Sequence, residues 1–183
     1  MSSGLLIVDI QNDYFTGGAM ELVDMEAAAE RAATLLAALR DAGAPVIHVQ
    51  HLAARPDATF FLPGTPGAEI HESVTPRAEE VVVRKHYPNS FRDTPLLDQV
   101  QAAGLDHLLI CGAMSHMCID ATTRAAFDLG LRCTVVSDAC ATRDLAFNGE
   151  TVPARAVHAA FMAALAVPYA RVVTTSEAVA SAN

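Results

Sequence analysis

Three reactive side chains lie where apolar runs of the sequence end. Asp9 stands in "LLIVDIQNDYF", Lys85 in "VVVRKHYPNSF" and Cys118 in "CGAMSHMCID". A carboxylate can accept a thiol proton, and a nearby ammonium group can stabilise the thiolate that attacks a carbonyl carbon. Backbone N–H groups can stabilise the oxyanion, and the protonated carboxyl group can then protonate a leaving amine and later activate water. These residue types therefore predict covalent catalysis by a cysteine.

Each of the three residues also has a simpler interpretation. Asp9 could cap a turn, Lys85 could be a solvated lysine at a strand end, and Cys118 could be a small buried hydrophobe. The catalytic interpretation depends on all three lying at one end of one sheet. The position of Cys118, where a strand turns into a helix, further predicts a lowered thiol pKa, because unpaired N–H groups there carry positive potential.

The elements that position these residues alternate in type along the chain. Apolar runs predict strands at 4–10, 44–51, 80–87, 107–114, 132–139 and 170–175, and helices are predicted at 25–43, 94–104, 118–129 and 152–166. This alternation predicts a three-layer α/β/α fold with a six-stranded parallel sheet, in which ligands bind beyond the carboxyl ends of the strands. The long segment 52–80, which contains "FFLPGTPGAEIHE", predicts a functional loop.

The composition of the chain limits which partners and which cellular compartment are expected. The 183 residues fit one domain, 1–183, and 52% of them are hydrophobic. A net charge of −9 without a basic stripe argues against nucleic acid and anionic membrane surfaces as partners. No apolar stretch reaches the length of a membrane span, and no secretory leader is recognisable. The four cysteines form no C-x-x-C pair, which favours free thiols and a cytoplasmic location.

Three stretches together resemble the isochorismatase-like cysteine hydrolases, a family that includes nicotinamidases and related amidohydrolases. They are "LLIVDIQNDYF", "VVVRKHYPNSF" and "CGAMSHMCIDATTRAAFDLG", and the resemblance covers nearly the whole chain. It implies the strand order 3-2-1-4-5-6 and a catalytic triad of Asp9, Lys85 and Cys118. It also implies a cis peptide bond between Ala113 and Met114, and an oxyanion hole formed by the N–H groups of Met114 and Cys118.

The sequence departs from the nicotinamidase pattern after the second predicted strand. Nicotinamidases hold a metal with an Asp-x-His pair and a later histidine, whereas "VIHVQHLAARPD" has no such pair, although His48, His51 and His71 are present. We therefore expect no metal and no other cofactor. Isochorismatases of siderophore pathways commonly lack the cysteine, so Cys118 favours an amide-type C–N bond, cleaved through a thioester. Vinyl-ether hydrolysis and a non-catalytic thiol- or ligand-binding role stay as alternatives.

Further residues are predicted to surround the triad. Asn12 is expected to orient Asp9 or the loop behind it, and His116 to bind substrate or to cap the helix of Cys118. Aromatic residues on the neighbouring loops are expected to wall a pocket for a small-molecule substrate, namely Phe15, Tyr87 and Phe91. The Ala-rich, weakly charged helix near the C-terminus and the family resemblance predict a homo-oligomer, either a dimer or a tetramer.

Overall fold

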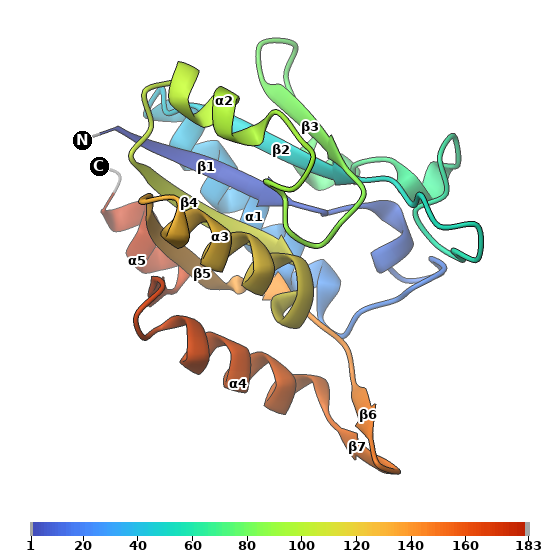
Figure 1. The fold of residues 1–183 in the computed structure, drawn as a ribbon. Helices are drawn as coiled ribbons and strands as arrows, with labels where there is room; N and C mark the ends of the chain where they lie inside the picture. The colour runs from blue at the N-terminus through green and yellow to red at the C-terminus, as the bar shows by residue number, and fades with distance from the viewer. Residues whose placement is uncertain (1, 182–183) are drawn as a thin grey trace.

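The computed structural model describes residues 2–181, which form three layers around a parallel sheet (Figure 1). The sheet strands are β1 (Ser3–Val8), β2 (Val46–His51), β3 (Val81–Lys85), β4 (His107–Ala113), β5 (Arg132–Ala141) and β8 (Arg171–Val173). Their order is β3-β2-β1-β4-β5-β8, and all neighbouring strands are parallel. The predicted fold class and strand order are confirmed, with β8 as the sixth predicted strand.

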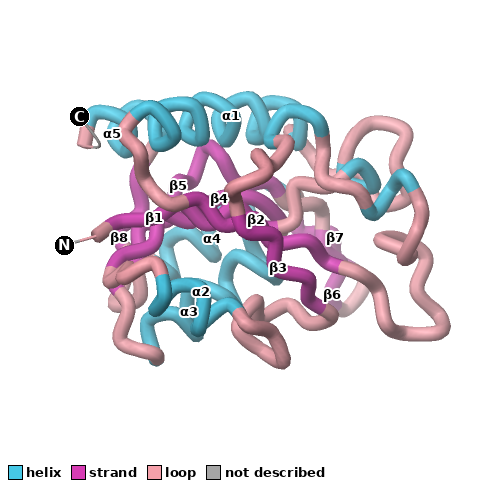
Figure 2. The backbone as a smooth tube through the Cα atoms, turned by 90° about the horizontal axis from the view of Figure 1, so that it is seen from above, coloured by secondary structure: helices cyan, strands magenta, loops and turns pink. Residues whose placement is uncertain are grey.

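Helices cover both faces of the sheet (Figure 2). One face carries α1 (Met25–Asp41) and α5 (Thr175–Ala180), and the other carries α2 (Leu96–Ala102), α3 (Asp120–Asp128) and α4 (Ala154–Leu165). Strand β1 is apolar throughout because it is buried on both sides. Leu5 and Ile7 join the apolar core beneath α1, while Leu6 and Val8 join the core on the opposite face.

Within residues 2–181, no helix combines the length and the apolar character that a membrane crossing requires.

Two boundaries near the candidate triad differ from the prediction. Strand β1 ends at Val8 instead of residue 10, because Asp9 adopts a left-handed backbone with φ of 53°, which an extended strand cannot accommodate. The predicted helix over 118–129 is present as α3, but its first residues, 118 and 119, belong to a preceding π-helical turn, η4 (Ser115–Ile119). Both differences lie at the carboxyl edge of the sheet, where the backbone leaves its regular path.

Two elements near the C-terminus were not predicted. Strands β6 (Leu145–Phe147) and β7 (Glu150–Val152) form an antiparallel hairpin that projects away from the sheet before α4 begins (Figure 1). The turn of the hairpin is Asn148-Gly149, and both residues have positive φ, as such two-residue turns require. Helix α5 begins with a capping box, in which the Thr174 and Glu177 side chains bond to each other's backbone N–H groups.

The predicted loop 52–80 folds against the segment that follows β1. It contains two short 3₁₀ turns, η2 (Pro66–Ala68) and η3 (Glu72–Val74), and it faces a third, η1 (Asn12–Tyr14). The buried Asp13 carboxylate holds the loop by accepting a hydrogen bond of 2.6 Å from the Phe61 N–H. Gly67 is required beside it, because a Cβ at that position would overlap the Asp13 carboxylate. The loop is thereby fixed over the carboxyl edge of the sheet.

Strand β4 approaches β1 closely at Gly112. This residue pairs with Val8, immediately before Asp9, and precedes Ala113 on the path to Cys118. Its φ is 123°, and a Cβ at this position would overlap the carbonyl oxygen of Val8. Glycine is therefore required where the two strands that carry Asp9 and Cys118 meet.

Replacing Gly112 by Ala should lower the free energy of unfolding by about 3 kcal/mol or more, because the added methyl group forces β1 and β4 apart. Chemical denaturation measures this change. The matched control is Gly104→Ala, which also has positive φ but meets no atom within 4 Å. The control substitution should lower the free energy of unfolding by about 1 kcal/mol, from the strained backbone conformation alone. Equal costs for the two variants would contradict the close-approach argument.

Candidate active site

Asp9 and Lys85 form a fully buried ion pair. Lys85 Nζ lies 2.8 Å from Asp9 Oδ2, and both side chains have no exposed surface. The contact is an ion pair and not an aligned hydrogen bond, because both Asp9 oxygens lack a hydrogen-bond partner among residues 2–181. Lys85 Nζ also donates to the carbonyl oxygen of Pro88 at 3.1 Å. The carboxylate thus keeps lone pairs that can receive a proton.

The sheet topology explains how this pair forms. Asp9 follows β1 and Lys85 ends β3, and β2 lies between these two strands. The long Lys85 side chain therefore crosses the end of β2 to reach Asp9. Burial alone lowers the pKa of Lys85, but the negative charge of Asp9 and the adjacent Cys118 sulfur raise it by more, so the net pKa is raised. Lys85 stays positively charged.

Cys118 lies in the π-helical turn η4, next to the ion pair. The N–H groups of Met117 and Ile119 both donate to the carbonyl oxygen of Met114, at 3.0 and 3.2 Å, and this closes the wide turn. The peptide bond between Ala113 and Met114 is cis, as the family resemblance implied. Cys118 Sγ lies within 4.8 Å of a carboxylate oxygen of Asp9, and its side chain is almost completely buried. The structure thus brings the three predicted side chains together.

The predicted lowering of the Cys118 pKa is wrong. Burial and, after it, the negative charge of Asp9 raise the pKa of this thiol to about 12, against the opposing effect of Lys85. Desolvation outweighs the positive potential of the turn because the sulfur lies inside the protein and not at its surface. In the resting protein the thiol is therefore neutral, and it needs a base in contact before it can react.

His51 and Gln11 belong to this site, although sequence reasoning assigned them no role there. His51 ends β2 and offers a ring nitrogen within 4.8 Å of both Cys118 Sγ and a carboxylate oxygen of Asp9. Gln11 is buried and fixes the backbone of His51, accepting from its N–H at 2.7 Å and donating to its carbonyl oxygen at 2.9 Å. Like Lys85, His51 lies at the carboxyl end of a predicted strand, so the argument that placed Lys85 in the site applies to His51 as well.

Tyr14 is a further residue beside the triad that sequence analysis did not identify. Its pKa is raised well above the usual value, first by burial and then by the nearby Cys118 and Asp9. Its ring packs against Phe61 with centroids 4.6 Å apart. The aromatic wall beside the triad is therefore built by η1 and the loop 52–80.

The other predicted pocket residues have varied contacts. Phe15 stacks on His71 with ring centroids 3.6 Å apart, and the Arg92 guanidinium lies 3.6 Å from the centroid of the Tyr87 ring. Phe91 packs against the apolar core on the side of α2 and α3. These contacts are packing interactions, and a role of the three aromatic residues in substrate binding stays a prediction.

The contacts of His116 and Asn12 narrow the alternatives predicted for these two residues. His116 does not cap a helix, since its Nδ1 lies 2.6 Å from the hydroxyl of Thr142 and ties the nucleophile turn to the end of β5. Asn12 donates to the carbonyl oxygen of Pro66 at 2.8 Å. It therefore orients the loop 52–80, which was one of the two predicted alternatives.

The histidines do not form the metal set of nicotinamidases. His48 lies 2.9 Å from Glu80, and His71 bonds to Ser73 and stacks on Phe15, so neither joins His51. Asp9, His51 and Cys118 are ligand types and lie close together. However, the Lys85 ammonium group already supplies a positive charge 2.8 Å from Asp9, which opposes a cation there.

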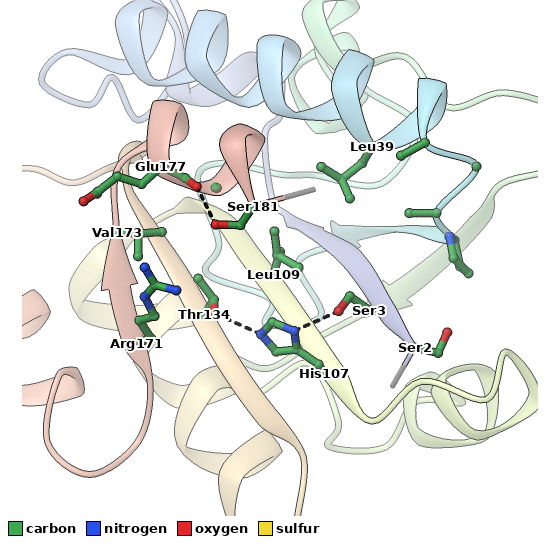
Figure 3. Close-up of a pocket in the computed structure, with 15 residues that line it drawn as sticks. Ser2, Ser3, Leu39, His107, Leu109, Thr134, Arg171, Val173, Glu177 and Ser181 are labelled. Carbon is green, nitrogen blue, oxygen red and sulfur yellow. Dashed lines mark hydrogen bonds between the residues drawn. The ribbon is translucent and has the colours of Figure 1, made fainter. Parts of the chain in front are cut away.

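A cavity of about 460 Å³ lies at the opposite end of the sheet (Figure 3). His107 occupies its floor, with Nδ1 2.9 Å from the Ser3 hydroxyl and Nε2 2.9 Å from the Thr134 hydroxyl. The strands enter the sheet here by their amino ends, whereas Asp9, Lys85 and Cys118 lie beyond the carboxyl ends. The hydroxyls of Ser3 and Thr134 and the His107 ring satisfy one another, and none of Asp9, Lys85 and Cys118 lines this cavity.

The fold and the buried Asp–Lys–Cys arrangement define a class of hydrolases. The family model described as the Isochorismatase domain matches residues 3–178. The chain therefore belongs to the isochorismatase family of hydrolases.

Individual relatives support this assignment. The uncharacterized isochorismatase family protein YddQ of Bacillus subtilis is 54% identical over 175 residues, covering 96% of this chain and 97% of YddQ. The maleamate amidohydrolase of Pseudomonas putida is 33% identical, covering 76% of this chain and 72% of that protein. A crystal structure of an isochorismatase-family protein from Oleispira antarctica superposes with a TM-score of 0.95 and 54% identity, over 98% of this chain and 96% of that one.

Replacing Asp9 by Asn should speed alkylation of Cys118 by iodoacetamide at pH 8. The negative charge of Asp9 raises the thiol pKa, so its removal beside Lys85 lowers that pKa and increases the thiolate fraction. Each unit of pKa is worth a factor of ten in that fraction, and we expect about a tenfold increase or more in rate. Peptide mass spectrometry after timed labelling measures the rate, with Cys118→Ala as the unlabelled control. A slower reaction of Asp9→Asn, with its fold intact, would contradict this electrostatic account.

Proposed function

We propose that this protein hydrolyses an amide-type C–N bond of a small molecule through a thioester on Cys118. The observation that carries the proposal is the buried contact between Asp9 and Lys85, with the Cys118 sulfur beside it. A thiol, a carboxylate with available lone pairs and a fixed ammonium group are the components that acyl transfer by cysteine requires. The isochorismatase-family membership and the maleamate amidohydrolase relative support this reaction type.

The first half of the reaction forms the thioester. The neutral Cys118 thiol transfers its proton to Asp9 as the sulfur attacks the carbonyl carbon of the substrate. Lys85 stabilises the negative charge that moves from the carboxylate to the sulfur. The N–H groups of Met114 and Cys118 are proposed as the donors to the oxyanion, and one such donor typically contributes about 3 to 4 kcal/mol. The raised pKa of Cys118 means that proton transfer accompanies the attack.

The first half ends as the amine departs, and the second half returns the protein to its starting state. The protonated Asp9 gives its proton to the leaving nitrogen, the C–N bond breaks, and ammonia or an amine departs. Asp9, again a carboxylate, removes a proton from a water molecule that attacks the thioester carbon. The C–S bond breaks, the sulfur takes the proton back from Asp9, and the carboxylic acid product leaves. No metal or cofactor takes part in these steps.

Replacing Cys118 by Ala should reduce amide hydrolysis by about a thousandfold or more, because no thioester can form. Release of ammonia is measured with a panel that includes maleamate, nicotinamide and short aliphatic amides. Cys133→Ala is the matched control, since Cys133 is also a buried free cysteine but lies in the core of β5. This control should keep full activity, and thermal unfolding establishes that both variants fold.

Two outcomes would reject the proposed function. Full activity of Cys118→Ala would exclude the covalent mechanism. Cleavage of isochorismate without any release of ammonia or amine from the amide panel would favour vinyl-ether hydrolysis instead.

A further inference from the structure

We propose that His51 holds the water molecule that hydrolyses the thioester on Cys118. The proposal rests on the proposed function and adds a water-binding group to the triad. It makes His51 a determinant of the second half of the reaction, in which the acyl group leaves the sulfur.

Three groups lie close enough together to bind one water molecule. The ring nitrogen of His51, a carboxylate oxygen of Asp9 and Cys118 Sγ all lie within 4.8 Å of one another. A water with hydrogen bonds of about 2.8 Å to His51 and Asp9 can bridge separations of up to about 5.6 Å. Such a water touches the base that must deprotonate it, and it lies next to the sulfur that carries the acyl carbon.

The protein leaves the His51 ring available for a small molecule. Among residues 2–181, the hydrogen bonds of His51 outside its strand use the backbone, through Gln11. The ring itself packs beside Phe61, with centroids 5.8 Å apart. Burial lowers the pKa of His51, and the positive charge of Lys85 lowers it further against the effect of Asp9. A neutral imidazole has one acceptor and one donor nitrogen, which suits it to orient water.

Gln11 fixes the position of His51. Its side-chain amide bonds to both backbone groups of His51 and also donates to the carbonyl oxygen of Ala68 at 2.8 Å. These bonds join the end of β2 to the segment of Asp9 and to the loop 52–80. The acid and the histidine are thus held by one short stretch of chain, and a small error in their separation would misplace the attacking water.

Acyl transfer from p-nitrophenyl acetate tests the proposal without knowledge of the natural substrate. The ester acetylates Cys118 and releases p-nitrophenol, and water then releases acetate from the sulfur. His51→Ala should keep a first burst of about one p-nitrophenol per protein, while its steady-state rate falls by about 10- to 100-fold. Intact-protein mass spectrometry should find the acetylated protein accumulating. His51→Gln, which can still bind water, should recover part of the steady-state rate.

The control is His107→Gln, at the opposite end of the sheet, which should match the wild type. A wild-type steady-state rate in His51→Ala would overturn the inference. An equal loss of the burst rate and the steady-state rate would also overturn it, because that result indicates a merely structural role. These results leave the proposed function intact. By contrast, steady-state turnover that survives Cys118→Ala would overturn both proposals.

Discussion

The buried ion pair between Asp9 and Lys85 is the contact on which the rest of the site depends. The two charged atoms are 2.8 Å apart, and neither side chain reaches solvent. An isolated charge at such a depth costs several kcal/mol, whereas a paired charge recovers much of that cost by attraction. The pair also joins the ends of β1 and β3 across β2. Loss of either partner would leave an uncompensated charge inside the protein, so the site needs both residues or neither.

The same burial determines the protonation state of the Cys118 thiol. Cys118 lies inside the protein beside a carboxylate, and its pKa is raised to about 12. The sulfur is therefore protonated at rest, and its reactivity depends on a base in contact instead of a standing thiolate. Backbone geometry provides that contact through the left-handed Asp9, the close approach at Gly112 and the π-helical turn around Cys118. The loop 52–80, held by Asp13 and Gln11, covers the edge where these residues meet.

Much of this arrangement could be predicted from the sequence, and the exceptions have physical reasons. Strands buried on both faces are continuous apolar runs, so the sheet was recognisable, and their carboxyl ends pointed to Asp9, Lys85 and Cys118. The sign of the thiol pKa shift was wrong because it depends on depth of burial, which a local pattern does not contain. The π-helical turn and the contact of His51 with the triad are likewise products of the tertiary fold. In contrast, the hairpin and α5 have local signals, Asn148-Gly149 and the Thr174–Glu177 capping box, from which both elements could be predicted.

In the resting protein, the Cys118 thiol is neutral and lies beside the Asp9 carboxylate, which takes its proton during the reaction. Infrared spectroscopy of the S–H stretch at neutral pH tests this most directly. The spectrum of Cys118→Ala is subtracted from that of the wild type, which cancels the signals of the three other thiols. The account predicts a positive S–H band from Cys118 in the resting protein. A difference spectrum without that band, in a protein whose Cys118 is shown to be unmodified, would mean a standing thiolate and would contradict the account.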